Sequence, residues 1–116
     1  MARVLVVDDD KGVRQLARLI LNTAGYDVAV AAHGQEALTF LKQDDADVIV
    51  LDLHMPVMDG YTFVHNLDDA RRRPPLIILS GDHADRAQIE LGADASLQKP
   101  FLPEDLVAKV SAVVHQ

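Results

Sequence analysis

The stretch Asp47-Val48-Ile49-Val50-Leu51-Asp52 decides how this chain folds. Four consecutive apolar side chains, three of them β-branched, stand directly before Asp52. A run of this kind is typical of a strand that is covered on both faces, as in a parallel sheet flanked by helices. We therefore predict a buried parallel strand from Asp47 to Leu51, with the Asp52 carboxylate at its carboxyl end.

Similar strand-length segments recur on both sides of this stretch, and segments of helical periodicity separate them. This alternation is typical of repeated βα units. It predicts an α/β protein with a doubly wound, five-stranded parallel sheet. The second strand alternates apolar and polar residues, which favours a position at an edge of the sheet. The expected strands span Arg3 to Val7, Tyr26 to Ala31, Asp47 to Leu51, Pro75 to Ser80 and Ala95 to Gln98.

The first and last helices have the clearest signals in the segments between the strands. Asp10 is placed to cap the first helix, and Gly25 to end it in a left-handed conformation. Pro103 suits the first turn of the last helix. The apolar faces expected for these two helices consist of Val13, Leu16, Ala17, Ile20, Ala24, Leu106, Val107, Val110 and Val114. The middle helices are expected near Gln35 to Lys42, Gly60 to Ala70 and Ala84 to Leu91.

The composition indicates one acidic domain. The chain has 116 residues, with 18 acidic and 11 basic side chains and a formal net charge of −7. This charge repels nucleic acid and anionic membranes, and no apolar run is long enough to span a bilayer. The absence of cysteine excludes disulfides and thiolate metal sites and fits a reducing compartment. We expect a single cytoplasmic domain over residues 1–116 that binds neither nucleic acid directly nor membranes.

Polar residues stand at the carboxyl ends of all the predicted strands except the second. Ligands of doubly wound sheets bind at this edge. The residues concerned are Asp8, Asp9 and Asp10 after the first strand, Asp52 after the third, Ser80 at the end of the fourth and Lys99 after the fifth. Because Asp10 is assigned to the helix cap, the others form the candidate site.

Three of these residues, Asp8, Asp9 and Asp52, would bring carboxylates together, where like charges raise one another's pKa. Such a group needs cations beside it, and Lys99 supplies one positive charge. A thiol-free set of carboxylate oxygens favours a hard divalent ion, in particular Mg²⁺, which binds carboxylates together with phosphate oxygens. We therefore predict a Mg²⁺ site. The five histidines show no pair at ligand spacing on one helix face, which argues against zinc.

The predicted site has the chemistry of a phosphoryl acceptor. A carboxylate beside Mg²⁺ and an ammonium group can attack phosphorus, because the two cations neutralise charge on the transferred oxygens. Asp52 suits this role best, since it ends a buried strand that holds it rigidly. The neighbouring pair Asp8 and Asp9 can then hold the metal.

Several motifs, in order along the whole chain, resemble the receiver domain of two-component response regulators, the CheY-like family. They are Val6-Val7-Asp8-Asp9-Asp10, the segment from Val48 to Gly60, Ile78-Leu79-Ser80-Gly81, Gly92-Ala93 and Lys99-Pro100-Phe101. The resemblance implies a flavodoxin-like sheet of order 2-1-3-4-5, a topology that the receiver protein CheY exemplifies. It also implies a function in phosphorelay signal transduction.

The resemblance assigns a role to each residue of the site. Asp52 would accept a phosphoryl group from a histidine kinase or a histidine phosphotransfer protein. Asp9 would bind Mg²⁺ directly, Asp8 directly or through water, and Asp52 and the backbone carbonyl of His54 would complete the protein ligands. Lys99 would pair with the phosphoryl oxygens.

The same resemblance extends to the residues around the phosphoryl group. Ser80 and Gly81 would contact it, and the Ser80 hydroxyl would move toward it and act as a switch. Gly81 leaves room for access to Asp52. The peptide bond between Lys99 and Pro100 is expected to be cis. His54 and Asp82 would flank the path of an attacking water.

One departure from the family concerns the switch. Ser96 stands three positions before Lys99, where many receivers carry an aromatic residue that turns inward on activation. We therefore predict that this aromatic switch is absent. The segment between Ser80 and Lys99 is also shorter than usual, which trims the fourth helix. Both differences fall on the face of the fourth helix, fifth strand and last helix, which many relatives use to dimerise or bind partners.

Three functions compete. The leading hypothesis is a phosphoacceptor module rather than an enzyme, with a downstream protein target or an output domain outside these 116 residues. It is then a stand-alone receiver or part of a longer regulator or hybrid kinase. A small aspartate-nucleophile phosphatase is the first alternative, because Asp8 and Asp10 form an Asp-x-Asp pair after the first strand. The second is a receiver-like scaffold that works without phosphorylation.

Overall fold

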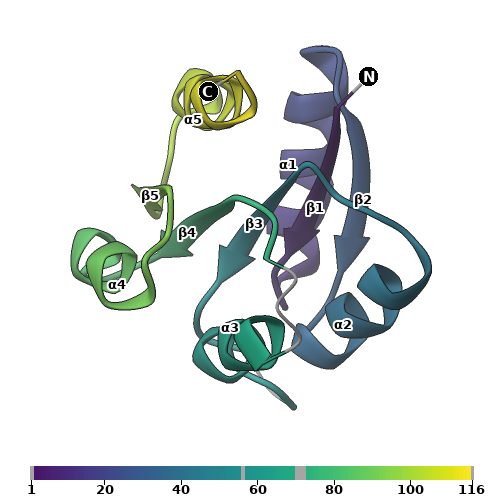
Figure 1. Cartoon of the computed structure of the whole chain (residues 1–116). Coiled ribbons are helices and arrows are strands. Elements are labelled where there is room, and N and C mark those ends of the chain that lie inside the picture. Colours follow the sequence, from purple (N-terminus) through teal and green to yellow (C-terminus); the bar gives the residue numbers. More distant parts are fainter. Residues whose placement is uncertain (1, 56, 70–72, 116) are drawn as a thin grey trace.

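Five parallel strands form one sheet in the order β2-β1-β3-β4-β5 (Figure 1). The computed structural model describes residues 2–55, 57–69 and 73–115. The strand order confirms the doubly wound, flavodoxin-like topology, and β2 lies at an edge as predicted. The strands are β1 (Arg3–Val7), β2 (Asp27–Ala31), β3 (Val48–Asp52), β4 (Leu76–Ser80) and β5 (Ala95–Gln98).

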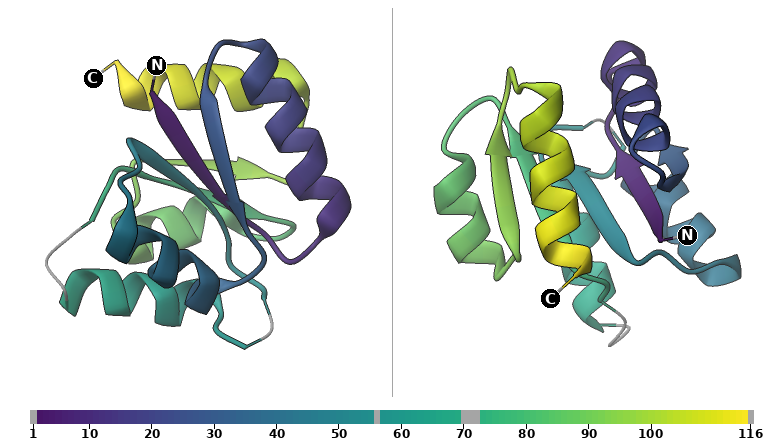
Figure 2. Two further views of the ribbon diagram at one scale, coloured as in Figure 1. Left: turned by 90° about the vertical axis from the view of Figure 1, so that its right-hand side faces the viewer. Right: turned by 90° about the horizontal axis from the view of Figure 1, so that it is seen from above.

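Helices cover both faces of the sheet. Helices α1 and α5 lie on one face, and α2, α3 and α4 lie on the other (Figures 1 and 2). Alternate residues of each buried strand therefore enter two separate cores: Leu5 belongs to one and Val4 to the other. The helices are α1 (Lys11–Thr23), α2 (Gly34–Gln43), α3 (Gly60–Asp69), α4 (Ala84–Leu91) and α5 (Pro103–Val114). Ala70, where the third helix was predicted to end, lies outside the described residues.

The predicted ends of α1 are confirmed. The Asp10 carboxylate accepts hydrogen bonds from the backbone N–H groups of Gly12, at 2.8 Å, and Val13, at 3.2 Å. These N–H groups have no partner within the helix, so the cap stabilises its first turn. Gly25 follows the helix with a φ of 98°, a conformation that glycine adopts without steric cost. In the described part of the chain, no helix combines the length and apolar character needed to cross a membrane.

The buried face of α1 is shifted from the predicted one. Leu16 is 48% exposed and Ala24 is also exposed, whereas Leu21 is fully buried. In α5, Val113 joins the core although it was not in the predicted set. The reason is geometric: α1 packs against β1, β2 and α5 at the edge of the sheet, and the directions of these neighbours select the buried side chains. Periodicity alone does not specify those directions.

The parallel arrangement brings the carboxyl ends of β1, β3, β4 and β5 to one edge of the sheet. The register pairs Val7 with Leu51, so Asp8 and Asp52 emerge from neighbouring strands. A hydrogen bond closes the loop that follows Asp52: the N–H of Gly60 donates to the carbonyl of Leu53 at 3.0 Å. The fold thus fixes both the strand end and the loop that hold Asp52.

Candidate functional site

Asp8 occupies the centre of the site, and its side chain is fully buried. Its Oδ1 accepts a hydrogen bond from the backbone N–H of Asp10 at 2.9 Å, and its Oδ2 accepts one from Nζ of Lys99 at 2.8 Å. Its backbone N–H donates to the carbonyl of Ala31 at 3.1 Å, which extends the pairing of β1 with β2. A charged group that is buried must be paired in this way, because an isolated charge is strongly disfavoured away from water.

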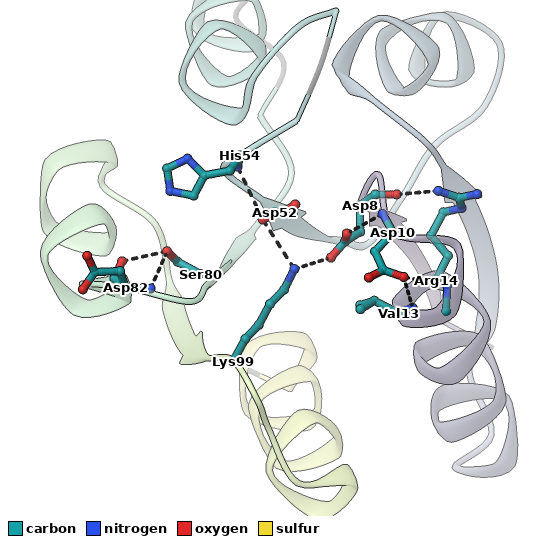
Figure 3. A network of polar contacts seen from close by, with 10 residues as sticks. Asp8, Asp10, Val13, Arg14, Asp52, His54, Ser80, Asp82 and Lys99 are labelled. Carbon is teal, nitrogen blue, oxygen red and sulfur yellow. Dashed lines mark hydrogen bonds and ion pairs between the residues drawn. The ribbon is translucent and has the colours of Figure 1, made fainter.

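Asp52 is the last residue of β3 and lies beside Asp8, with Lys99 between them (Figure 3). Its Oδ1 accepts a hydrogen bond from the backbone N–H of His54 at 3.4 Å and lies 3.5 Å from Nζ of Lys99. Carboxylate oxygens of Asp8, Asp9 and Asp52 lie within 4.8 Å of one another. The three predicted carboxylates and the predicted lysine therefore meet at one place.

Burial and like charge perturb the titration of Asp52. Burial, followed by the negative charge of Asp8, raises the pKa of Asp52 to about 6, against the opposing effects of Lys99 and the His54 N–H. Burial by itself lowers the pKa of Lys99, but hydrogen bonds and charge attraction to Asp8 and Asp52 outweigh it and raise that pKa above its usual value. Lys99 therefore stays protonated at neutral pH, and Asp52 is largely ionised there.

We expect the substitution Asp52→Asn to stabilise the metal-free protein. The pKa of Asp52 is raised on folding, so ionised Asp52 disfavours the folded state, by about 3 kcal/mol at most for a shift of this size. Below the unfolded pKa both states are protonated, and the substitution gains nothing. The gain should grow as the pH rises and be complete above pH 6. Urea unfolding of both proteins at pH 4 and pH 8 tests this, and an equal difference at the two pH values contradicts it.

The Ser80 hydroxyl is buried and bonded to its own loop (Figure 3). Its Oγ donates to the carbonyl of Asp82 at 2.7 Å and accepts from the backbone N–H of Asp82 at 3.2 Å. The backbone N–H of Lys99 donates to the Ser80 carbonyl at 2.8 Å, which joins the ends of β4 and β5. A side chain added at Gly81 would meet no atom within 4 Å, so this side of the loop is open.

Ser96 connects β5 to α4. Its Oγ donates a hydrogen bond to Oε1 of Gln88 at 2.8 Å. The predicted length of α4 is confirmed: the helix spans Ala84–Leu91 and ends at Gly92, which has a φ of 64°. The peptide bond between Lys99 and Pro100 is cis, as predicted.

The donor atoms of the site suit a hard cation. All three clustered groups are carboxylates, and no histidine or sulfur atom joins them in the described part of the chain. Oxygen ligands of this kind fit Mg²⁺ rather than zinc. Asp9 is exposed, so the cluster is open to solvent on one side, as an ion that keeps several waters requires. The contribution of the His54 carbonyl remains a prediction.

Sequence reasoning missed Arg14, which reaches the site from the first turn of α1 (Figure 3). Its Nη1 donates to the backbone carbonyl of Asp8 at 2.8 Å. The available signal was its spacing, since residue 14 follows the Asp10 cap by one helical turn and faces back toward the strand end. Asp10 does not join the carboxylate cluster but caps α1, so the Asp-x-Asp pair that suggested the phosphatase alternative does not act as one group of ligands.

The fold and this site together define a receiver domain. The sequence model of the response regulator receiver domain matches residues 4–111, and the chain therefore belongs to that family, the receivers of two-component systems. The solved receiver domain of a Francisella response regulator is 35% identical, with a TM-score of 0.91, and the match covers 99% of this chain and 98% of that one.

Two further relatives are informative. The transcriptional regulatory protein PrrA of Mycobacterium tuberculosis is 42% identical over 117 residues, which cover 98% of this chain and 50% of PrrA. The chain thus spans about half the length of the curated relatives that it matches. The structure of the response regulator TrrA from Thermotoga maritima, in complex with Mg²⁺ and BeF, is 29% identical, with a TM-score of 0.87, over 97% of this chain and 99% of that one.

Proposed function

We propose that Asp52 accepts a phosphoryl group in a reaction that needs Mg²⁺, and that the chain is a phosphoacceptor rather than an enzyme that turns over substrates. The observation that carries this proposal is the buried Asp52 carboxylate, 3.5 Å from the Lys99 ammonium and within the carboxylate cluster. The complex of the related TrrA with Mg²⁺ and BeF supports the choice of ion.

The donor in this proposal is a phosphohistidine on a histidine kinase or phosphotransfer protein. An Asp52 oxygen attacks phosphorus, a P–O bond forms, and the P–N bond breaks. The imidazole nitrogen keeps the bonding electrons and takes up a proton from solvent. Lys99 neutralises charge on the transferred oxygens, and the carboxylates of Asp8, Asp9 and Asp52 would hold the ion together with the His54 carbonyl. Bound Mg²⁺ supplies further charge neutralisation at those oxygens.

Ser80 provides the proposed response to phosphorylation. Its hydroxyl has one proton to donate, so it must give up the hydrogen bond to the Asp82 carbonyl in order to donate to a phosphoryl oxygen, which would move the loop that begins α4. Gly81 would offer its backbone N–H on the open side of this loop. Because Ser96 is bonded to Gln88 of α4, the change would pass to β5 through this polar contact rather than through an aromatic side chain. The partner that reads it is a downstream protein or an output domain.

Acetyl phosphate with Mg²⁺ tests the proposed function directly. We expect intact-mass spectrometry to show one phosphoryl adduct that is stable in acid and labile in base. The adduct should be absent when Mg²⁺ is removed with EDTA and absent in Asp52→Asn. If the wild-type protein gives no adduct, or Asp52→Asn keeps it, the proposal is wrong. Steady release of phosphate from phosphate esters, abolished by Asp8→Asn, would instead favour the phosphatase.

Mg²⁺ is also expected to stabilise the folded protein. An ion that binds only the native state at ten times its Kd adds about 1.4 kcal/mol to the free energy of unfolding. Asp9→Asn should remove most of this gain by deleting an exposed carboxylate of the cluster. Asp10→Asn is the matched control, because asparagine also caps helices and residue 10 lies outside the cluster. Thermal unfolding with and without Mg²⁺ gives the comparison; equal gains in the two variants contradict the assignment.

A further inference from the structure

Asp8 is held at four separate points. Its N–H bonds Ala31, its Oδ1 bonds the Asp10 N–H, its Oδ2 bonds Lys99, and its carbonyl bonds Arg14. Three of these partners are close to Asp8 for evident reasons: Ala31 lies on the neighbouring strand β2, Asp10 lies in the adjacent turn, and Lys99 belongs to the site. Arg14 is the exception, because it reaches Asp8 from α1 through a long side chain (Figure 3).

Arg14 contacts the backbone of Asp8 and not its carboxylate. A guanidinium group beside carboxylates ordinarily forms bidentate pairs with them. Here Nη1 donates instead to a neutral main-chain carbonyl at 2.8 Å, while the Asp8 carboxylate oxygens bond Asp10 and Lys99. The contact therefore fixes the backbone at the end of β1 without covering the carboxylate cluster.

We propose that Arg14 is a positioning residue of the metal site. It holds the Asp8 carbonyl and thereby sets the direction in which the backbone leaves β1, on which the places of Asp8 and Asp9 in the cluster depend. This inference rests on the proposed Mg²⁺-dependent function. Groups that orient metal ligands commonly change metal affinity 10- to 100-fold when they are removed.

The two possible effects of Arg14 on Mg²⁺ have opposite signs. As a positive charge near the cluster, Arg14 repels Mg²⁺, so its removal would tighten binding. As a positioning residue, it organises the ligands, so its removal weakens binding. The sign of the change therefore distinguishes positioning from simple charge.

The test is calorimetric titration of Mg²⁺ into the unphosphorylated full chain. We expect Arg14→Met to raise the Kd for Mg²⁺ about tenfold. Arg14→Lys, which keeps the charge and one donor group, should lie between Arg14→Met and the wild type. The matched control is Arg18→Met. Arg18 is exposed and lies one turn further along α1, so this substitution removes the same charge and leaves the contact between Arg14 and Asp8 in place. This control should leave the Kd within twofold of the wild type or lower it.

Thermal unfolding in Mg²⁺-free buffer, together with amide NMR spectra, shows whether each variant is folded. If Arg14→Met does not fold, the Kd of Arg14→Lys is compared with that of the wild type instead. An unchanged or lower Kd in the folded Arg14 variants overturns the inference, as does an equal rise in Arg18→Met. These results leave the proposed function intact if the wild type still binds Mg²⁺ and forms the Asp52 adduct. A wild type that binds no Mg²⁺ overturns both.

Discussion

Replacing Lys99 by methionine is expected to destabilise the metal-free protein by about 3 kcal/mol at pH 8. The Lys99 ammonium lies 2.8 Å from Asp8 and 3.5 Å from Asp52, and both carboxylates are buried. Methionine has a similar length but no charge, so it leaves the two buried carboxylates without the positive charge between them. Removing one member of a buried ion pair costs far more than the intact pair contributes.

The loss of stability in Lys99→Met should be larger at high pH than at low pH, because of the titration of Asp52. Lys99 lowers the pKa of Asp52 against the effects of burial and of Asp8, so its removal raises that pKa further. Ionised Asp52 then disfavours folding at pH 8, whereas at pH 5 Asp52 takes up a proton and the loss shrinks. Urea unfolding at both pH values measures this.

Two comparisons sharpen the Lys99 experiment. Lys109→Met, at an exposed position of α5, removes the same charge and should change the free energy of unfolding by less than about 0.5 kcal/mol. The double variant Lys99→Met with Asp52→Asn should recover part of the stability, since one of the two unpaired carboxylates is gone. A Lys99→Met protein as stable as the Lys109 control, or equally destabilised at pH 5 and pH 8, would refute the electrostatic account.

Gly60→Ala is the second substitution with a large expected effect. A Cβ atom at residue 60 would lie 2.7 Å from Cα of Leu53 and 2.9 Å from the carbonyl oxygen of Asp52. Both are backbone atoms, which cannot turn aside as a flexible side chain can. We expect a loss of about 3 kcal/mol and a displaced Asp52, because close packing converts one added methyl group into a backbone shift.

Gly81→Ala is the matched control for this experiment. Gly81 also lies in a loop at the carboxyl edge of the sheet, but a Cβ there would meet nothing within 4 Å. Gly81→Ala should therefore change the free energy of unfolding by less than about 0.5 kcal/mol, which urea unfolding of both variants measures. Equal stabilities of the two variants would contradict this prediction, because they would show that the loop after Asp52 can accommodate the added methyl group without loss of stability.

Much of the fold followed from local patterns that need no knowledge of distant residues. The apolar run before Asp52 predicted a buried strand, and that strand is β3, with Asp52 as its last residue. The cap at Asp10 and the left-handed Gly25 were predictable because each acts within its own helix turn. The meeting of Asp8, Asp9, Asp52 and Lys99 followed from one further rule, that parallel strands end at the same edge.

Other features depend on directions that a linear pattern does not contain. Leu21, rather than Leu16, enters the core because α1 meets β1, β2 and α5 from a particular side. Likewise, the Ser80 hydroxyl bonds Asp82, although its place at a strand end is compatible with several partners. The buried face of a helix and the hydrogen-bond partner of a hydroxyl depend on groups that come close together only in the folded chain.

The sequence by itself predicted the alternation of strands and helices, the carboxylates and lysine of the site, and, through its motifs, membership of the receiver-domain family. Only the tertiary structure decided that Arg14 holds the Asp8 carbonyl, and that burial beside Asp8 raises the pKa of Asp52 to about 6. The physical reason is that residue type and spacing specify which groups reach the sheet edge. Their burial, distances and hydrogen-bond partners arise from packing between elements that are far apart in the chain.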